Sequence, residues 1–538
     1  MPRYIFITGG VCSGLGKGIS CASIGMLLKA AGHKVALQKL DPYLNVDPGT
    51  MNPYQHGEVF VTKDGAETDL DVGHYERFID EEFSSLSSVS TGQVYQRVLD
   101  KEREGAFLGK TIQVIPHVTN TIKEYIKKCA ESSAADIFIC EIGGTVGDIE
   151  AEPYLEAIRQ LHHEEGHHNV MFVHLVLLPH LKSSGEVKTK PAQASVRELR
   201  RMGINADIIL CRYDDHVQKE HLEKIALFCD VPKEAVIPAP TVGTIYEVPL
   251  NFEKYAITKL VSDHFRMEHK APKLAAWETF VEKIKSDLPP LFIALVGKYT
   301  ELKDAYLSVI EAVKSAGYEN GRKAELIWID SEKLENGGKE AEEEWEKVRQ
   351  AKGIVVMGGF GKRGVEGKIA VAKYAREHKV PYLGLCLGMQ IAAIEFARNV
   401  LGIADAHSAE FDEQTKNPVI YLMEGQRTIY KKGGTMRLGN YACIVQKNSK
   451  SFTAYGEENI TERHRHRYEF NGAYTARFEE QGMTIAGVNP ESGLCEILEN
   501  KDHPWFVGVQ FHPEFTSRPL RPHPLFREFI KAALANRT

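Results

Sequence analysis

The sequence has no long hydrophobic run and no excess of basic residues. Its longest apolar run, Val170 to Leu178, contains His174 and is too short to cross a bilayer. The opening residues, MPRYIFITGG, also hold too short an apolar stretch for a signal peptide. The formal net charge is -7, whereas nucleic-acid-binding domains usually carry excess Lys and Arg. We therefore expect a cytoplasmic protein with no membrane and no nucleic-acid partner.

Cysteine is scarce and follows no regular spacing. The chain has nine cysteines, an odd number, which argues against a disulfide framework and for a reducing compartment. Two of them, Cys12 and Cys386, lie inside motifs considered below.

The chain is too long for one ordinary domain. It has 538 residues, of which 43% are hydrophobic and 26% charged, so two globular α/β modules are expected. Apolar runs such as 4–8, 35–38 and 136–142 alternate with helical stretches, which predicts parallel sheets covered on both faces. Charged residues 267–290 end in a Pro-Pro pair. We predict two doubly wound parallel-sheet domains, 1–266 and 291–538, joined by the linker 267–290.

A Gly-rich loop, Gly9 to Gly18, follows the first expected strand and precedes a helical stretch from Ile19 to Ala30. Backbone N–H groups of such a loop, and the N-terminus of the next helix, bind phosphate oxygens, and Lys17 can reach the terminal phosphates. Gly18 stands where a standard P-loop has a Ser or Thr that holds Mg²⁺. A tight turn without a ligand is the alternative. The order of strand, Gly-rich turn, Lys and helix favours the phosphate site.

Two acidic residues are the candidates for holding Mg²⁺ in place of that hydroxyl. Asp71 lies in the acid-rich stretch GAETDLD, and Glu141 lies near the end of the strand DIFICEI. Mg²⁺ favours carboxylates together with phosphate oxygens and water. Either acid taken alone would be read as an exposed or capping residue, and only the phosphate loop supports the metal interpretation.

The C-terminal half contains a candidate nucleophile. The motif GLCLG puts Cys386 between an expected strand, 380–385, and a helix, 389–401, in the strand–nucleophile–helix arrangement that exposes a side chain at the edge of a sheet. His512 and Glu514 follow another strand and can act as base and orienting acid. The loop 358–361 can form an oxyanion hole. A lone Cys is usually a buried hydrophobe, so the hypothesis depends on the three features occurring together.

The run RHRHR, residues 463–467, has three interpretations. It is too short for a nucleic-acid patch in an acidic protein, and as a metal site it offers only His464 and His466 on one strand face. We favour a strand whose arginines point one way, with Arg467 positioned to bind a carboxylate through two hydrogen bonds.

The motifs taken together resemble one family over essentially the whole chain. They are YIFITGG, GLGKG, KLDPYLNVDPGTMNPYQHGEVFV, DGAETDLDVGHYERF, EIGGTVGDIE, GEVKTKPAQ, GKYTELKDAY, GLCLGMQ, RHRHRYEFN and VGVQFHPEF. GLCLGMQ and HPE are shared with class I glutamine amidotransferases in general. The N-terminal motifs resemble those of the CTP synthase family. The resemblance implies an N-terminal P-loop-like amidoligase and a C-terminal glutaminase. ATP would phosphorylate O4 of UTP, and ammonia from L-glutamine would replace the phosphate to give CTP.

The resemblance also implies roles for individual residues. Those expected at ATP are Gly14, Leu15, Gly16, Lys17, Gly18, Ile19 and Asp71, with Mg²⁺ held by Asp71 and Glu141. Those expected at UTP or CTP are Ser13, Asp148, Ile149, Glu150, Lys188, Thr189, Lys190, Pro191, Ala192, Gln193 and Lys224. Those expected at glutamine are Gly359, Phe360, Leu387, Gln390, Glu410 and Arg467, beside the triad Cys386, His512 and Glu514. Lys39 would lie at the phosphates, and His56 near the ammonia passage.

Regulation and assembly are implied as well. Relatives are activated by GTP, inhibited by CTP and form homotetramers. This chain departs from the family at Met357, which replaces a Pro before the Gly-Gly of the oxyanion loop, at Ala192, which replaces a hydroxyl residue, and at Leu307, where some members have a Lys linked to GTP activation. Two alternatives stay open: a P-loop amidoligase that amidates a carboxylate of a cofactor precursor, and a non-catalytic assembly protein.

Overall fold

The computed structural model describes residues 2–183, 185–298, 302–422 and 435–536. Residues 299–301, part of the GKYTELKDAY motif, lie outside the described residues. The chain forms two compact units, and they are not consecutive in sequence. The first comprises Met1–Pro48 and Asp71–Glu282, and the second comprises Gly49–Leu70 and Lys283–Thr538. The second unit therefore includes a piece of the N-terminal sequence, which we call the 49–70 segment.

The first unit is built on a parallel sheet of seven described strands, whose register is parallel at every pair. Their order is β11 (Val236–Pro240), β10 (Ile208–Tyr213), β7 (Val170–Leu177), β1 (Arg3–Gly9), β6 (Ile137–Ile142), β2 (Val35–Asp41) and β5 (Ser88–Ser90). The central strands are buried from end to end, as expected of a parallel sheet that is covered on both faces.

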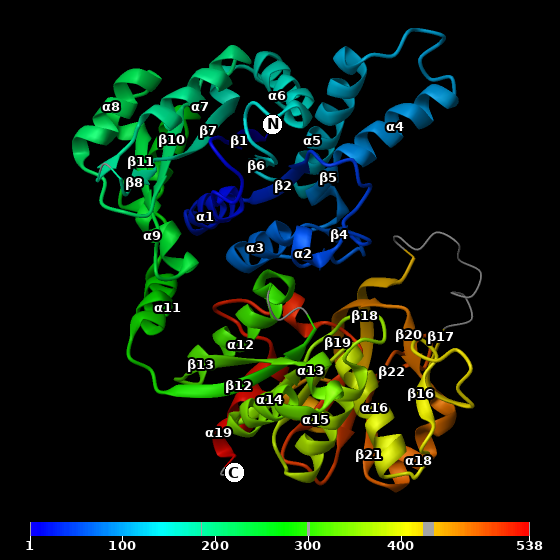
Figure 1. The fold of residues 1–538 in the computed structure, drawn as a ribbon. Helices are drawn as coiled ribbons and strands as arrows, with labels where there is room; N and C mark the ends of the chain where they lie inside the picture. Colours follow the sequence, from blue (N-terminus) through cyan, green and yellow to red (C-terminus); the bar gives the residue numbers. More distant parts are fainter. Residues whose placement is uncertain (1, 184, 299–301, 423–434, 537–538) are drawn as a thin grey trace. The chain divides into compact units, whose positions relative to one another are not determined.

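Helices cover both faces of this sheet (Figure 1). On one face lie α1 (Lys17–Ala30), α3 (Leu70–Ile79), α9 (Val248–Glu253) and α10 (Ile257–His264). On the other lie α4 (Thr91–Arg103), α5 (Thr119–Ser133), α6 (Glu152–Glu165), α7 (Lys190–Arg201) and α8 (Lys219–Cys229), which share one apolar core with the sheet. A short hairpin joins β8 (His180–Leu181) to β9 (Glu186–Val187). Within the predicted linker, residues 275–285 form α11 (Ala275–Lys285).

The second unit has a mixed sheet of nine described strands. Five run parallel: β13 (Lys323–Asp330), β12 (Pro290–Gly297), β14 (Gly353–Val356), β15 (Tyr382–Leu385) and β23 (Phe506–Val509). Four more continue it antiparallel: β22 (Cys495–Asn500), β21 (Met483–Val488), β18 (Arg437–Val445) and β19 (Asn459–His466). The expected α/β fold class is confirmed, but the prediction did not anticipate this antiparallel extension.

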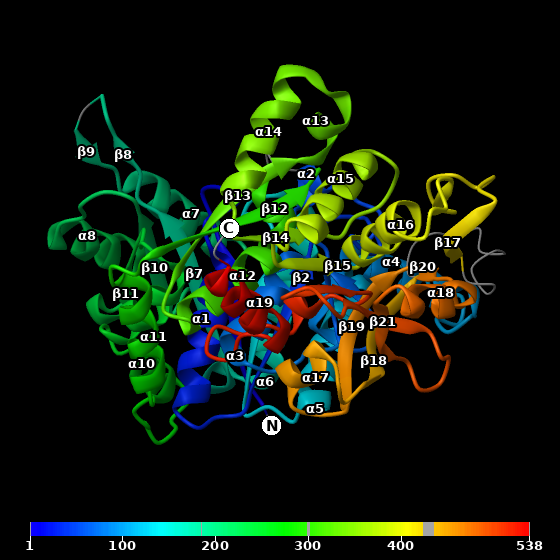
Figure 2. The ribbon, with the colours of Figure 1, turned by 90° about the horizontal axis from the view of Figure 1, so that it is seen from below.

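Helices again lie on both faces of the parallel part (Figure 2). One side carries α13 (Ser331–Asn336), α14 (Gly338–Gln350), α15 (Val365–Glu377) and α16 (Leu387–Asn399). The other carries α12 (Leu307–Glu319), α17 (Lys450–Tyr455) and α19 (Pro524–Ala535). A small sheet of β16 (Ala406–Ser408), β17 (Asn417–Leu422) and β20 (Tyr468–Phe470) and the helix α18 (Thr475–Glu480) complete the unit.

The 49–70 segment is tied to the second unit by polar and aromatic contacts. It contains α2 (Pro53–His56) and the hairpin strands β3 (Phe60–Val61) and β4 (Glu67–Thr68). The fully buried Arg463 donates to the Val61 carbonyl at 2.9 Å, and Arg465 donates to Glu67 at 2.9 Å. Arg463 and Arg465 thus point the same way, as predicted for this strand, whereas Arg467 lies beyond the end of β19. His464 and His466 lie buried, 2.9 Å apart.

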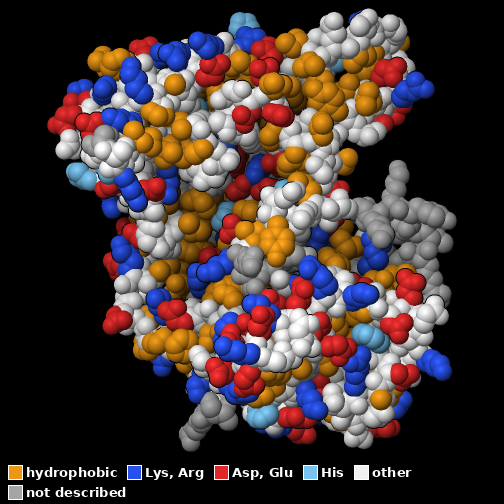
Figure 3. All heavy atoms as spheres, viewed as in Figure 1, with side chains coloured by type: hydrophobic (Ala, Val, Ile, Leu, Met, Phe, Trp, Pro, Cys, Tyr) orange, Lys and Arg blue, Asp and Glu red, His pale blue; other side chains and the backbone are white. Residues whose placement is uncertain are grey.

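One face of the molecule carries charged side chains of both signs. On the face shown in Figure 3, Lys and Arg side chains are interspersed with Asp and Glu side chains. Among the described residues, no helix combines the length and the apolar composition needed to cross a membrane.

Candidate active sites

The Gly-rich loop lies at the carboxyl end of β1 and leads into α1, as the sequence predicts. Gly14 and Gly16 have φ values of 69° and 99°, which glycine adopts without the steric cost that a side chain would bring. Gly16 caps α1, and its carbonyl accepts from the backbone and the hydroxyl of Ser20. Lys17 donates to the Gly144 carbonyl at 2.7 Å. The loop therefore has the shape of a phosphate cradle with a cation at its base.

Gly18 leaves the space that Asp71 fills. A Cβ on Gly18 would lie 1.9 Å from Asp71 Oδ1, so any side chain there would displace the carboxylate. Asp71 stands in the first turn of α3 and forms an ion pair with Lys39. The acid thus occupies the position from which the Ser or Thr of a standard P-loop would reach a metal ion.

Glu141 is the second acid at this place. It is buried on β6, in register with Ile7 of β1 and Lys39 of β2, and it accepts a hydrogen bond from Tyr75. Burial, reinforced by the negative charge of Asp71, raises the pKa of Glu141 to about 7. Two carboxylates that repel each other beside two lysines form a set of oxygen donors that suits Mg²⁺, since a bound dication would relieve the repulsion.

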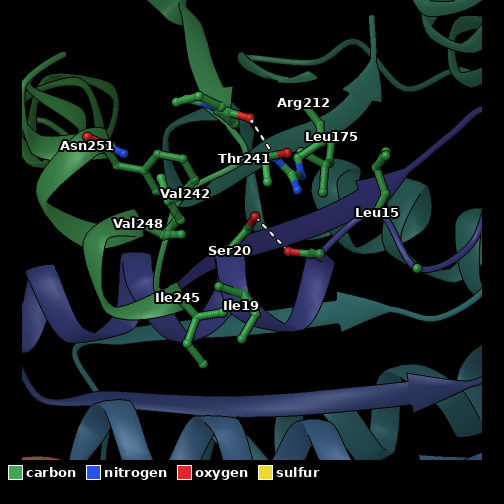
Figure 4. A pocket seen from close by; sticks show the side chains of 15 residues that line it. Leu15, Ile19, Ser20, Leu175, Arg212, Thr241, Val242, Ile245, Val248 and Asn251 are labelled. Carbon is green, nitrogen blue, oxygen red and sulfur yellow. Dashed lines mark hydrogen bonds between the residues drawn. The ribbon is translucent and has the colours of Figure 1, made fainter. Parts of the chain in front are cut away.

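A pocket of about 160 Å³ opens beside the phosphate loop. Gly14, Leu15, Gly16 and Ile19 line it, and Figure 4 shows Leu15, Leu175 and Arg212 at one end and Val248 and Asn251 at the other. Such a slot, apolar with a few polar groups, fits a flat heterocyclic base. No recognised sequence motif indicates several of the other lining residues, which come from β10, the loop after β11 and α9: Arg212, Thr241, Val242, Val248 and Asn251.

The residues expected at the pyrimidine nucleotide lie in four places: the phosphate loop, the loop 143–150, the stretch that leads into α7, and α8. The loop 143–150 reaches the phosphate loop through the Val146 N–H, which donates to the Gly9 carbonyl at 2.8 Å. α7 follows the KTKPAQ stretch, and a Cβ on Gly10 would collide with Ser195 of this helix, so the helix lies against the phosphate loop. Exposed residues are Ser13, Asp148, Ile149, Glu150, Lys190 and, on α8, Lys224; Lys188, Pro191 and Gln193 are half-buried, and Thr189 and Ala192 are buried.

In the second unit, Cys386 lies between β15 and α16 with φ 50° and ψ -101°, a strained conformation. The flanking glycines make this turn possible. A Cβ on Gly384 would lie 2.6 Å from the Gly388 backbone, and one on Gly388 would lie 2.2 Å from the Val356 carbonyl. The G-x-C-x-G spacing therefore follows from how closely the strand, turn and helix pack.

His512 and Glu514 follow β23, next to β15, and lie beside Cys386. His512 Nδ1 is 2.7 Å from Glu514 Oε1. Burial acts to lower the pKa of His512, but the negative charges of Glu514 and of the Cys386 thiolate outweigh it and raise this pKa to about 10. The histidine is therefore set to hold the proton of the thiol as an ion pair.

Gln510, which the sequence analysis did not single out, also contacts the nucleophile. It is fully buried, and its Nε2 donates to Cys386 Sγ at 3.6 Å. Its Oε1 accepts from Gln390, which also donates to the Tyr468 carbonyl. Gln510 stands two residues before His512, just after the end of β23, and this spacing is the sequence signal that could have identified it as a site residue.

Two buried lysines fix the glycine loop that faces Cys386. Lys368 donates to the Met357 carbonyl at 3.1 Å, and Lys298 donates to the carbonyls of Phe360 and, at 2.9 Å, Gly361. Burial lowers the pKa of Lys368 to about 7. These hydrogen bonds hold the carbonyls toward the lysines and so restrict rotation of the loop's peptide units. The loop is therefore restrained although Met357 stands where the family has a Pro. A Cβ on Gly358 would lie 3.1 Å from His512, so the loop passes close to the histidine.

The residues expected at glutamine surround this loop and α16. Glu410 Oε1 accepts from the Gly361 N–H at 2.6 Å. Arg467 follows β19 and donates to Thr435 at 3.1 Å. Leu387 and Gln390 are buried in the first turn of α16, and Phe360 is 42% exposed beside Arg465. The second unit thus brings the residues expected at glutamine together around Cys386 and the loop 358–361.

A cavity of about 230 Å³ adjoins this site within the second unit. Its lining includes Gly358, His512 and Glu514, together with parts of the 49–70 segment and α12. His56 is not part of this lining; its Nε2 is 3.1 Å from Asp69 Oδ2.

A phosphate-loop unit joined to a unit with a cysteine–histidine–glutamate site defines a class, the ligases that take nitrogen from glutamine. Residues 3–267 match the family model described as CTP synthase N-terminus, and residues 301–532 match glutamine amidotransferase class-I. The CTP synthase of Roseiflexus castenholzii is 57% identical over 99% of this chain and 95% of its own length, and that of Bacillus velezensis is 53% identical over 99% of each. The glutaminase domain of Trypanosoma brucei CTPS with bound acivicin is 38% identical, covering 46% of this chain and 95% of its own, with a TM-score of 0.43. The chain belongs to the CTP synthase family and is an enzyme of the ligase class.

Proposed function

We propose that the first unit uses ATP to phosphorylate O4 of UTP and that ammonia from glutamine then displaces the phosphate, giving CTP. The O4 oxygen is a poor leaving group, and phosphorylation converts it into a good one. The observation that carries this assignment is the place of Asp71, whose carboxylate fills the space that Gly18 leaves beside the phosphate loop.

Lys17 and Lys39 have the charge and the location to neutralise the phosphoryl group as it transfers, since each lies beside the acids Asp71 and Glu141. Asp71 and Glu141 would hold Mg²⁺, which when bound neutralises charge on the nucleotide phosphates. The base of ATP would lie in the pocket that Leu15, Ile19 and Arg212 line.

We assign UTP, and CTP as a feedback inhibitor, to Ser13, to residues 148–150 and 188–193, and to Lys224. We also propose, from membership of the family, a homotetramer in which a second copy completes the nucleotide site. Ile149, one of the residues assigned to the nucleotide, is 78% exposed in the single chain.

In the second unit, the Cys386 thiolate would attack the side-chain carbonyl carbon of glutamine. The carbon–nitrogen bond breaks, His512 gives its proton to the departing nitrogen, and ammonia leaves a thioester. Water, deprotonated by His512, then hydrolyses the thioester to glutamate. Glu514 orients His512, backbone N–H groups of the loop 358–361 stabilise the oxyanion, and Glu410 and Arg467 bind the charged groups of glutamine, with Gly359, Phe360, Leu387 and Gln390 around them.

The ammonia would leave through the cavity behind His512. Ammonia is mostly protonated in water at neutral pH and then cannot attack, so an enclosed route preserves the reactive form. The cavity borders the histidine that releases ammonia and is lined on its far side by Gly49, Gly57 and Val59 of the 49–70 segment. GTP is proposed as an activator, as in the family, although Leu307 replaces the Lys that some members have.

Narrowing this cavity should separate hydrolysis from synthesis. With Val59→Phe, we expect glutamine hydrolysis within about twofold of wild type, because the triad is untouched, and glutamine-dependent CTP formation lowered by roughly tenfold. Synthesis from ammonium should be retained. Glutamate and CTP would be measured in the same reaction, and Val59→Ala, which widens the cavity, is the matched control. Equal rates of CTP formation in the two variants would exclude this cavity as the route.

The overall proposal is tested with the wild-type chain, UTP, ATP and Mg²⁺, and either glutamine or ammonium as the nitrogen donor. We expect CTP with both donors, and no CTP after chelation of Mg²⁺, because both acids need the ion to hold the phosphates. If no CTP forms with either donor, with or without GTP, the UTP assignment fails and amidation of a carboxylate becomes the better hypothesis.

A further inference from the structure

Three side chains with metal-binding atoms gather in the first unit, away from the phosphate loop. His167 lies in the turn before β7, Asp207 lies just before β10, and His264 ends α10. One potential ligand atom from each lies within 4.8 Å of the other two. The cluster is at the amino ends of β7 and β10, whereas the phosphate loop follows the carboxyl end of the parallel strand β1. It therefore lies at the opposite edge of the sheet from Asp71 and Glu141.

The spacing of these atoms is near that of a tetrahedral metal site. His264 Nδ1 is 3.6 Å from Asp207 Oδ1. An ion with bonds of about 2.0–2.1 Å in tetrahedral geometry places its donors roughly 3.3–3.4 Å apart. His167 is exposed on a three-residue turn, so its ring can move the remaining distance.

Hydrogen bonds to the backbone occupy one polar atom of His264 and one of Asp207 and leave the other atom of each side chain facing the cluster. His264 Nε2 lies 2.9 Å from the Val170 carbonyl, to which it can only donate, so Nδ1 carries the lone pair. Asp207 Oδ2 accepts from the Phe172 N–H at 2.7 Å, which fixes the carboxylate with Oδ1 toward His264. Metal-binding histidines typically donate their other N–H to a backbone carbonyl in this way.

A third histidine, His162, lies beside the cluster. His162 Nε2 is 3.4 Å from His167 Nδ1, and the two rings meet edge to face. Two imidazoles and one carboxylate are ligands that suit Zn²⁺ and similar transition-metal ions, while Mg²⁺ prefers oxygen ligands alone.

We propose that His167, Asp207 and His264 bind one divalent transition-metal ion of the zinc class, with water as the fourth ligand. The ion would join the end of α10 to the edge of the sheet at β7 and β10. Its role is structural, because it lies at the sheet edge away from the phosphate loop and holds together parts of the chain that are far apart in sequence.

The test is a Zn²⁺ titration followed by calorimetry. It uses the full-length chain carrying Cys386→Ala, which removes a thiolate that would itself bind zinc, freed of metal and kept in saturating Mg²⁺. We expect one Zn²⁺ per chain, a rise in Tm on its addition, and visible absorption bands of tetrahedral Co²⁺ when cobalt replaces zinc. Adding His264→Ala or Asp207→Asn should weaken binding by about 100-fold or more and abolish the Tm rise.

The matched control is His163→Ala, which removes an exposed imidazole that neighbours the cluster without belonging to it. It should leave the Zn²⁺ affinity unchanged. Asp207→Asn keeps an oxygen for the Phe172 N–H, so loss of binding in that variant cannot be ascribed to loss of the fold. The absence of stoichiometric Zn²⁺ binding, or equal binding by the parent and the Asp207→Asn variant, would overturn the proposal.

Discussion

Replacing Cys386 by alanine is expected to lower glutamine-dependent CTP formation by about 10⁴-fold or more, because the bond-forming sulfur is lost. CTP formation from ammonium should stay within about twofold of wild type, since the sites proposed for ATP and UTP are in the first unit. Both rates are measured as CTP produced, with glutamine or ammonium chloride as the donor. The ratio of the two rates isolates the hydrolytic half from the synthetic half.

Cys443→Ala is the control for this experiment. Cys443 is a buried cysteine of β18 in the same unit, so its substitution tests the effect of removing a core sulfur. Both donors should support near-wild-type rates in that variant if it folds. If Cys386→Ala instead loses both donor activities while remaining folded, the two reactions are not separable and the assignment of Cys386 to glutamine alone is wrong.

Restoring the standard P-loop hydroxyl should inactivate the enzyme. The side chain of Gly18→Ser would start 1.9 Å from Asp71 Oδ1, so the carboxylate must leave its place beside Lys39. We expect CTP formation to fall by at least about 100-fold with glutamine and with ammonium alike, because phosphorylation of UTP precedes both. The measurement is the ammonium-dependent rate over a range of ATP and Mg²⁺ concentrations.

Gly472→Ser provides the comparison, since a Cβ at Gly472 meets nothing within 4 Å. That variant should retain full activity. Gly18→Ala separates the bulk of the side chain from its hydroxyl, and it should be as inactive as Gly18→Ser. If Gly18→Ser stays active, the proposed role of Asp71 is wrong or the serine can replace it. The Asp71 carboxylate would then move away from residue 18 without loss of activity.

The sequence was sufficient to predict those parts of the two candidate sites whose structure depends on residues close together in the chain. The phosphate loop between β1 and α1, and Cys386 between β15 and α16, are local arrangements, and their glycine spacing reflects close packing that any chain of this fold must satisfy. His512 and Glu514 too form one short motif, but their place beside Cys386 depends on the pairing of β23 with β15, which is not a local feature.

Features built from distant parts of the chain could not be predicted. Lys298 and Lys368 support one loop from two distant parts of the chain. Lys298 lies in the motif GKYTELKDAY, but that motif does not reveal its contact with the loop. At Met357 the sequence shows only the missing Pro and not the Lys368 ammonium that donates to the Met357 carbonyl. Arg463 was assigned correctly to a strand face, but its partner, the Val61 carbonyl, comes from about 400 positions earlier in the chain.

The 49–70 segment determines how the chain can be divided into separately expressed fragments. A recombinant fragment that begins near Lys283 would contain Cys386, His512 and Glu514 but lack Glu67 and the wall formed by Gly49, Gly57 and Val59. Such a fragment would retain the residues for hydrolysis with its cavity open to water, and the buried Arg463 would lose its Val61 acceptor. Glutamine turnover by that fragment would report on the chemistry of Cys386 alone. A split version of the enzyme intended to keep ammonia enclosed would need the 49–70 stretch grafted onto the C-terminal piece.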